Sequence, residues 1–178
     1  MAKTKWTVDP VHSSLEFVVK HMMISKAKGE FTEFDATIEA DPEDLTDSSI
    51  EFNVDVNSID TRKEDRDNHL RSADFFDVEN HPKLTFNVTD IKKKTENNYD
   101  VTGDLTIRGT TKPVTFNVDF EGQHKDPMSG NTVAGFSGSA EINRKDFGLT
   151  WNAALETGGV LVGEKVKLNV EIEAHKEA

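Results

Sequence analysis

Apolar and polar residues alternate along most of this chain, and this period of two constrains the fold more than any other feature. The alternation is clearest where Ile50, Phe52 and Val54 alternate with Glu51 and Asn53. Successive side chains of a β-strand point to opposite faces of the sheet, so such a segment predicts a strand with one buried face. Similar segments occur at residues 14–19, 34–39, 84–88, 99–107, 114–120, 134–142 and 166–172.

Residues that favour turns separate these segments. They include Asp41-Pro42-Glu43-Asp44, Asn97-Asn98, Gly109-Thr110-Thr111-Lys112-Pro113, Asp126-Pro127-Met128-Ser129-Gly130-Asn131 and Gly158-Gly159. Parallel strands are covered on both faces and read as continuously apolar, so the alternation indicates antiparallel pairing. About eight strands joined by short turns predict an all-β sandwich or barrel.

The inward faces of the predicted strands combine large and small side chains. Many phenylalanines share these faces with small residues, namely Ala36, Gly103, Ala134, Gly138 and Ala140. A barrel of about eight strands is either filled by its own side chains or holds one small ligand. The period of the pattern does not measure an empty volume, so a packed core and a ligand-binding pore both remain open.

One segment departs from the strand pattern. Thr61-Arg62-Lys63-Glu64 matches the capping box that begins a helix, and it predicts one short helix over about residues 62–72. Such a short polar helix is marginally stable alone in water. We therefore expect it to be held on the rest of the fold by Leu70, Phe75 and Phe76.

Composition excludes several classes of function. The chain has 178 residues and is predicted to form a single domain over 1–178. It contains no cysteine and carries a formal net charge of -12. The chain therefore has no disulfide or thiolate chemistry, and its negative charge opposes binding to nucleic acid. No apolar segment reaches the ~18 residues of an integral membrane span. No apolar core of a signal peptide follows Lys3 and Lys5, so the expected location is cytoplasmic.

The histidines and carboxylates give no clear catalytic or metal motif. No two histidines have the i, i+4 spacing of a helical zinc site, although His21 and His69 could approach each other in a barrel. Asp9, His12 and Ser13 resemble the members of a catalytic triad, but known triads assemble across a fold rather than within one turn. The prediction is therefore no catalytic residue, no metal and no cofactor.

Longer motifs resemble one protein family. The segment from Asn57 to Asp77 reads Asn-Ser-Ile-Asp-Thr-Arg-Lys-Glu-Asp-Arg-Asp-Asn-His-Leu-Arg-Ser-Ala-Asp-Phe-Phe-Asp, and His81-Pro82-Lys83-Leu84-Thr85-Phe86 follows. Further segments are 9–13, 29–31, 103–113, 142–148 and 162–166. Together they are similar to the YceI-like family of polyisoprenoid-binding proteins, in family order over nearly the whole chain.

The resemblance implies an extended, eight-stranded antiparallel barrel of the lipocalin-like type. Its tubular pore would hold a long-chain isoprenoid, such as that of an isoprenoid quinone, or a fatty amphiphile. Family members are often dimers, which implies a homodimer here. Many are periplasmic, which differs from the location expected from the start of this sequence.

The predicted function is non-catalytic binding, storage or transport of such a lipid. The residues expected to line the pore are Phe17, Val19, Phe34, Phe52, Val54, Phe86, Leu105, Phe116, Phe136 and Leu168. The pore mouth and the helix are expected to be held by His69, Leu70, Phe75 and Phe76. Two alternatives remain: a lipid-modifying enzyme with His12 or His69 as the base, and a stress-related or structural interaction protein with a filled barrel.

Overall fold

The structure is a computed structural model that describes residues 3–41, 43–152, 155 and 161–177. The expected Gly158-Gly159 turn and Pro42 of the expected turn at 41–44 lie outside these residues. Among the described residues, no helix is long and apolar enough to cross a membrane.

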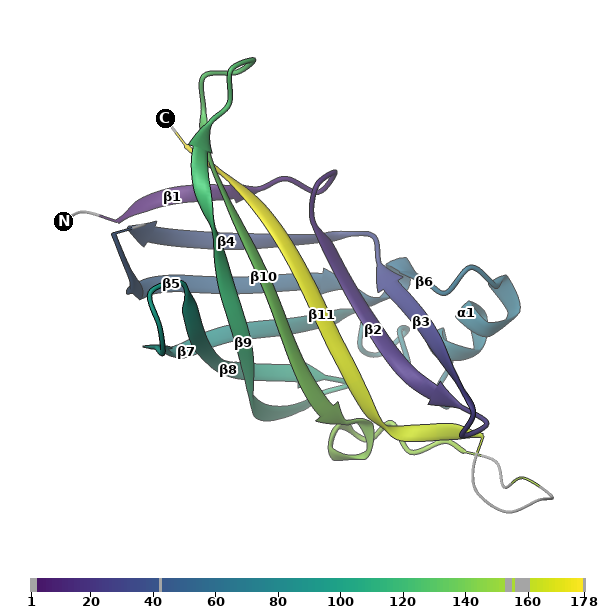
Figure 1. Cartoon of the computed structure of the whole chain (residues 1–178). Helices are drawn as coiled ribbons and strands as arrows, with labels where there is room; N and C mark the ends of the chain where they lie inside the picture. The colour runs from purple at the N-terminus through teal and green to yellow at the C-terminus, as the bar shows by residue number, and fades with distance from the viewer. Residues whose placement is uncertain (1–2, 42, 153–154, 156–160, 178) are drawn as a thin grey trace.

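The described chain is mostly antiparallel β-sheet (Figure 1). The strands are β1 (Thr4–Val8), β2 (Ser14–His21), β3 (Ser25–Phe31), β4 (Phe34–Asp41), β5 (Asp44–Asp55), β6 (Ile59–Asp60), β7 (Lys83–Lys93), β8 (Asn98–Ile107), β9 (Thr110–Lys125), β10 (Thr132–Asn143) and β11 (Val162–Lys176). Three short helices accompany them: η1 (Val56–Ser58), α1 (Glu64–Arg71) and η2 (Arg144–Phe147).

The sheet closes on itself along β11. One edge of β11 pairs with β10, while its other edge pairs with β1 near Ala174 and with β2 near Leu168. β1 and β2 therefore lie one after the other along the same edge of β11. On their other edges, β1 pairs with β4 and β2 pairs with β3. Short strands such as β1 and β2 lie end to end and occupy the place of one strand in the barrel. The 11 strands of the sheet therefore form a closed barrel of eight strand positions. The predicted eight-stranded antiparallel barrel is confirmed.

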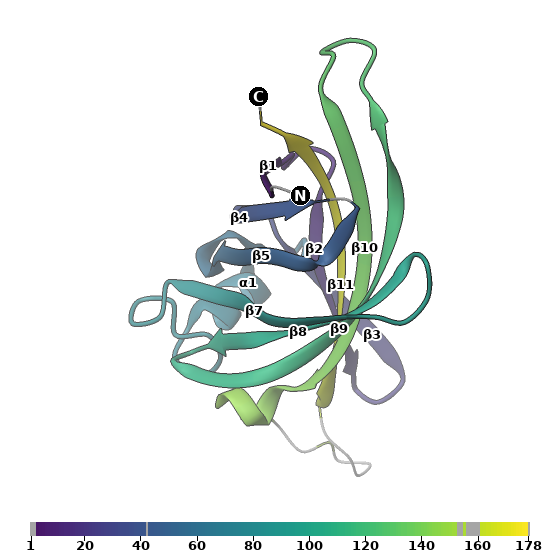
Figure 2. The ribbon, with the colours of Figure 1, turned by 90° about the vertical axis from the view of Figure 1, so that its left-hand side faces the viewer.

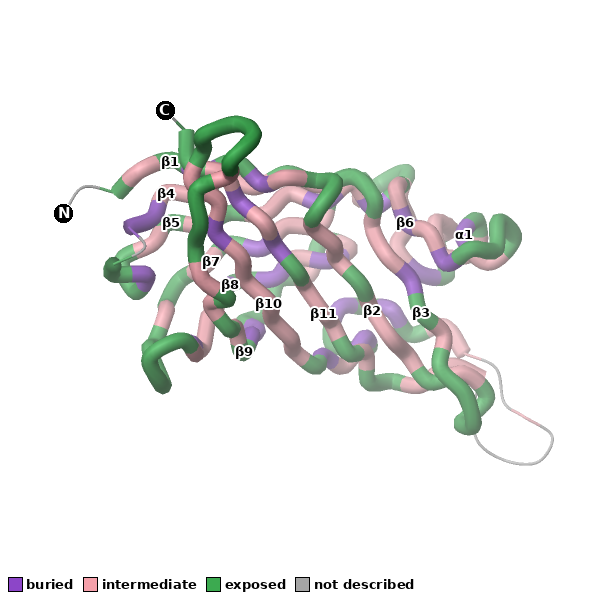
Figure 3. Tube along the Cα trace, turned by 45° about the horizontal axis from the view of Figure 1, so that its top comes forward, coloured by how far each residue is buried: buried purple, intermediate pink, exposed green. Residues whose placement is uncertain are grey.

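The two ends of the barrel differ. Both chain termini lie at one end, where β1 meets the end of β11, and α1 lies at the other (Figures 1 and 2). Buried residues form one cluster that includes Phe75 and Phe147 and a second that includes Trp6 and Ala174. Figure 3 shows that buried, intermediate and exposed residues alternate along the strands. Leu70, Phe75 and Phe76 pack against the first cluster, so all three expected anchors contact the barrel.

The short helix is present, but the predicted capping box is wrong. The helix begins at Glu64, its N-cap is Lys63, and no side chain caps its first turn. Arg62 has φ 66°, in the left-handed region, so the backbone before the helix is not helical. Instead, the carboxylate of Asp67 accepts hydrogen bonds from the hydroxyl and from the amide of Thr61, the latter at 2.9 Å.

Candidate ligand-binding site

A cavity lies inside the barrel. The centre of a water molecule could occupy about 210 Å³ inside it, whereas a cavity that holds a single water needs only about 10–15 Å³ by the same measure. The wall of the cavity is apolar. The barrel is therefore not filled by its own side chains, which speaks against the packed-core alternative.

The register of the strands explains how the wall forms. Phe52 of β5 lies opposite Phe86 of β7, which in turn lies opposite Leu105 of β8. Residues that are direct partners across antiparallel strands point to the same face, so these three side chains form one row on the inside. The ring of Phe116 on β9 packs edge-on against that of Phe86, with 5.1 Å between the ring centroids. Alternation in the sequence and pairing in the sheet thus direct the same side chains inward.

Eight of the ten residues predicted to line the pore do line the cavity: Phe17, Phe52, Val54, Phe86, Leu105, Phe116, Phe136 and Leu168. Val19 and Phe34 are not part of its wall. Val19 lies two residues beyond Phe17 toward the end of β2, and Phe34 is the first residue of β4 and packs with the cluster around Trp6. Both residues lie on strands that form the wall, but outside the part of each strand that faces the cavity. Contact of the eight residues with a ligand stays a prediction.

The cavity has further apolar walls that the sequence prediction left out. They are Leu15, Phe31, Ile38, Ala40, Leu45, Ile50, Leu84, Val88, Ile91, Tyr99, Val101, Ile107, Val118, Val170 and Ile172. Seven of these fifteen residues lie two residues from a predicted member on the same strand, and the period of two would have found them. Leu45 and Ile91 are out of phase with Phe52 and Phe86 on their strands, and β7 has a register shift between Val88 and Asp90, so the period does not find these two.

Aromatic rings connect the segment after α1 with the cavity. Phe76 packs edge-on against Phe31, and Phe31 packs against Phe17, with centroid distances of 5.9 and 5.7 Å. Since Phe17 and Phe31 line the cavity, the predicted anchor Phe76 supports this part of its wall.

His69 packs within an aromatic group rather than facing the cavity. Its ring lies edge-on to Phe75 and Trp151, at centroid distances of 5.1 and 4.7 Å, and its Nε2 is 2.9 Å from Asp74 Oδ2. Its role as a helix anchor stays a prediction. Trp151 was missed because nothing in its sequence context indicates an inward direction.

Arg144 is a buried charged residue that the sequence analysis did not single out. Its side chain is 3% exposed and donates hydrogen bonds to the main-chain oxygens of Leu149, Trp151, Val162 and Gly163, at 2.6 to 3.2 Å. Burial lowers the pKa of its guanidinium. These bonds join the loop after η2 to the start of β11. The motif around Arg144 contributed to the family resemblance but gave no sign of burial.

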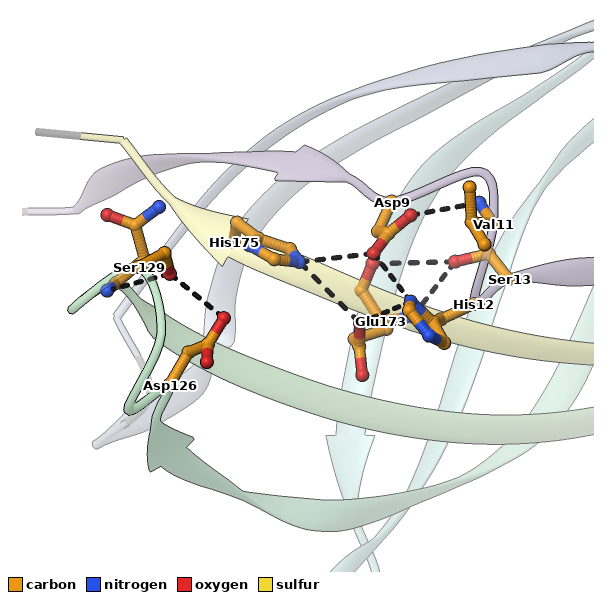
Figure 4. A network of polar contacts seen from close by, with 9 residues as sticks. Asp9, Val11, His12, Ser13, Asp126, Ser129, Glu173 and His175 are labelled. Atoms are coloured by element: carbon orange, nitrogen blue, oxygen red, sulfur yellow. Dashed lines mark hydrogen bonds and ion pairs between the residues drawn. The ribbon is translucent and has the colours of Figure 1, made fainter.

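At the end of the barrel that carries the termini, a polar cluster surrounds the break between β1 and β2 (Figure 4). His12 Nδ1 lies 2.8 Å from Asp9 Oδ2 and 3.2 Å from Glu173 Oε2. His175 Nε2 lies 3.4 Å from the same oxygen of Asp9 and 3.5 Å from that of Glu173. The hydrogen bond between Asp9 and His12 lowers the pKa of Asp9 and raises that of His12.

The sequence allows a pair of His21 and His69, but the structure brings a different pair together. The barrel brings His12 and His175 to the same two carboxylates, whereas His21 and His69 belong to no group of potential metal ligands among the described residues. Asp9 and His12 do meet within one turn, but Ser13 does not join them. Its hydroxyl bonds to the main chain of Glu173, so the three residues do not form a triad.

The fold and the cavity together define a class of protein: a closed, lipocalin-like barrel with an apolar interior. A family model described as the YceI-like domain matches residues 6–174, and the chain belongs to that family. The predicted family is thus confirmed. Curated relatives include UPF0312 proteins of Staphylococcus epidermidis and Staphylococcus aureus, 46% and 45% identical over 170 residues, which are 96% of this chain and 96% of each relative.

Solved structures share the barrel. BcnA of Burkholderia cenocepacia aligns with a TM-score of 0.81 and 26% identity, covering 93% of this chain and 98% of that one. The Campylobacter jejuni YCEI protein aligns with a TM-score of 0.76 and 30% identity, covering 89% and 90%. A polyisoprenoid-binding domain from Saccharophagus degradans aligns with a TM-score of 0.70 over 98% and 99%, but at 13% identity it supports the fold alone.

Proposed function

We propose that this protein binds a long-chain isoprenoid, or a fatty amphiphile of similar width, inside its barrel without modifying it chemically. The observation that carries the proposal is the apolar cavity, whose walls come from β-strands all around the barrel. The resemblance of the sequence motifs to the YceI-like family of polyisoprenoid-binding proteins favours this choice of ligand.

The binding energy would come from the tail of the lipid. Burying roughly 500 Å² of apolar surface at about 25 cal/mol per Å² gains about 12 kcal/mol. Association costs of about 4–15 kcal/mol offset much of that gain, which leaves room for micromolar binding. Because the wall is apolar, the site would select by the length and width of the tail more than by hydrogen bonds.

A non-catalytic role is supported by the residues around the cavity. Among the described residues that line it, none is a histidine, and Glu16, the carboxylate of the lining, exposes no polar surface to it. A general base must come within hydrogen-bonding reach of the proton that it removes. Neither His69 nor His12 lines the cavity, so neither is placed to act on a lipid inside it, as the enzyme alternative requires.

The experiment is a thermal melt on three samples: protein as purified, protein stripped of lipid, and stripped protein reloaded with a long polyprenol. A ligand at about a hundredfold excess over Kd adds about 2.7 kcal/mol of stability to the folded state. For a chain of this length, that corresponds to a rise in Tm of roughly 5–10 °C. Mass spectrometry of the stripped extract would identify the lipid.

The control is a headgroup analogue without a tail, which should leave the Tm unchanged because it buries little apolar surface. An unchanged Tm after both stripping and reloading would contradict the proposal. Recovery of a chemically altered polyprenol from wild type, but not from His12→Ala or His69→Ala, would favour the enzyme. The implied homodimer stays a prediction that light scattering tests on the same samples.

A further inference from the structure

The polar cluster at the barrel end is built from both ends of the chain. Asp9 and His12 belong to the break between β1 and β2, while Glu173 and His175 lie on the same face of β11 (Figure 4). The amide of Asp9 donates to the main-chain oxygen of Glu173 at 2.8 Å. Main-chain and side-chain contacts therefore fix the two segments against each other at the seam where the barrel closes.

One atom of the cluster has no hydrogen-bond partner. Nε2 of His175 is shielded from solvent and forms no hydrogen bond, yet it points at the oxygens of Asp9 and Glu173. A buried polar atom without a partner is costly, and the great majority of such atoms are paired. The position between this nitrogen and the two oxygens is where a cation would satisfy all three.

The distances fit a transition-metal ion. Zinc lies about 2.0–2.1 Å from histidine nitrogen and about 2.0–2.2 Å from carboxylate oxygen, in tetrahedral geometry. Two ligand atoms of such a tetrahedron are therefore about 3.3–3.5 Å apart. The distances from His175 Nε2 to Asp9 Oδ2 and to Glu173 Oε2, 3.4 and 3.5 Å, lie in that range, whereas His12 Nδ1, 2.8 Å from Asp9 Oδ2, is hydrogen-bonded to that oxygen instead.

We propose that Asp9, Glu173 and His175 bind a divalent transition-metal ion of the zinc type. Single ligand atoms of these three residues all lie within 4.8 Å of one another. His12 Nδ1 lies 2.8 Å from Asp9 Oδ2 and 3.2 Å from Glu173 Oε2, so it would orient the two carboxylates from behind, and water would complete the coordination.

The donor set selects this class of ion. An imidazole nitrogen beside two carboxylates suits zinc and its neighbours, whereas calcium and magnesium prefer six or more oxygen ligands. The net charge of -12 favours cations in general, so selectivity comes from the nitrogen atom. A bound ion would cross-link the segment that begins β2 to the end of β11 and so hold the seam of the barrel closed.

The experiment measures zinc binding by the full-length protein after treatment with a chelator, using competition with a chromophoric zinc indicator. We expect one zinc ion per chain and a rise in Tm of several degrees with saturating zinc. We expect His175→Ala to lose at least about 100-fold in affinity, because even residues behind the ligands contribute about 10–100-fold. Replacing zinc with Co²⁺ gives a second readout, a visible spectrum of bound cobalt that His175→Ala should abolish.

Asp126→Asn is the matched control. Its carboxylate lies in the hairpin loop beside His175, but it accepts hydrogen bonds from the Met128 amide and the Ser129 hydroxyl, both at 2.9 Å. This variant should bind zinc like the wild type. A melt in chelator checks that each variant is folded. Wild-type protein that takes up no zinc, or equal affinities for wild type and His175→Ala, would overturn the proposal.

Discussion

The ring of Phe17 lies over the α-carbon of Gly29, its direct partner in the β2–β3 pair, and occupies the space that a side chain at position 29 would need. A β-carbon on Gly29 would overlap this ring and would also lie 2.8 Å from the methyl group of Thr61. Since Phe17 lines the cavity, Gly29 determines how far its ring extends inward.

Gly29→Ala should push the ring of Phe17 into the cavity. We expect a loss of about 1–3 kcal/mol in the free energy of unfolding, as is usual for overpacking, together with weaker polyprenol binding. Chemical denaturation and ligand titration measure the two effects. Gly135→Ala is the control, because its β-carbon would meet only Glu121 Cβ at an ordinary 3.5 Å. Equal effects at both positions would show that the close approach of Phe17 is unimportant.

The alternation on β7 can be tested with the same substitution at two neighbouring positions. Phe86 is 8% exposed and lines the cavity, whereas Asn87 is exposed and lies opposite Glu51 and Asp104. Phe86→Lys should cost about 3–5 kcal/mol or more, because it removes a buried ring and introduces a charge.

Asn87→Lys should be neutral or slightly stabilising, since opposite charges across strands contribute roughly 0.2–1 kcal/mol. Urea denaturation curves for the two variants would settle the direction of each side chain. A stable Phe86→Lys protein that still binds polyprenol would mean that the inward face of β7 has been misassigned.

Removing the guanidinium of Arg144 should loosen the loop after η2. Arg144→Met leaves the main-chain oxygens of Leu149 and Trp151 without this donor, and each buried group left unpaired costs about 1–3 kcal/mol. We expect a loss of roughly 2–4 kcal/mol in a thermal or urea melt. Lys145→Met is the comparison: its exposed bridge to Glu164, at 2.8 Å, contributes only about 0–1 kcal/mol. Similar losses for the two variants would contradict the importance of burial here.

The attachment of α1 should depend on Asp67. This residue is 7% exposed and accepts from both the amide and the hydroxyl of Thr61. Asp67→Ala should cost about 1.5–3 kcal/mol, the range for hydrogen bonds to a charged group, and should speed amide hydrogen exchange in the helix.

Asp65→Ala, on the exposed side of the first turn, should cost less than about 1 kcal/mol, because it loses only the interaction with the helix dipole. Hydrogen exchange of α1 that is unaffected by Asp67→Ala would show that the helix is held by its apolar anchors alone.

The sequence by itself determined eight of the strands and the direction of most of their side chains, whereas β1, β3 and β6 were not predicted. A period of two is a local property of a chain in an extended conformation, so Phe52, Phe86 and Leu105 could be placed on inward faces before any pairing was known. The resemblance of the motifs to a known family added the prediction that the strands close into a barrel. The start of α1 was harder, because Thr61-Arg62-Lys63-Glu64 fits a capping box locally, whereas in the fold Thr61 bonds to Asp67 instead.

Only the tertiary structure decided the cavity and the polar cluster. Periodicity gives the face on which Val19 and Phe34 lie, but the enclosed volume depends on the radius of the barrel and on what packs at its ends. The cluster joins Ser13 to Glu173 across 160 residues and brings Asp9 to His175. No spacing within either segment encodes that contact, because it exists only once β11 has paired with β1 and β2 to close the barrel.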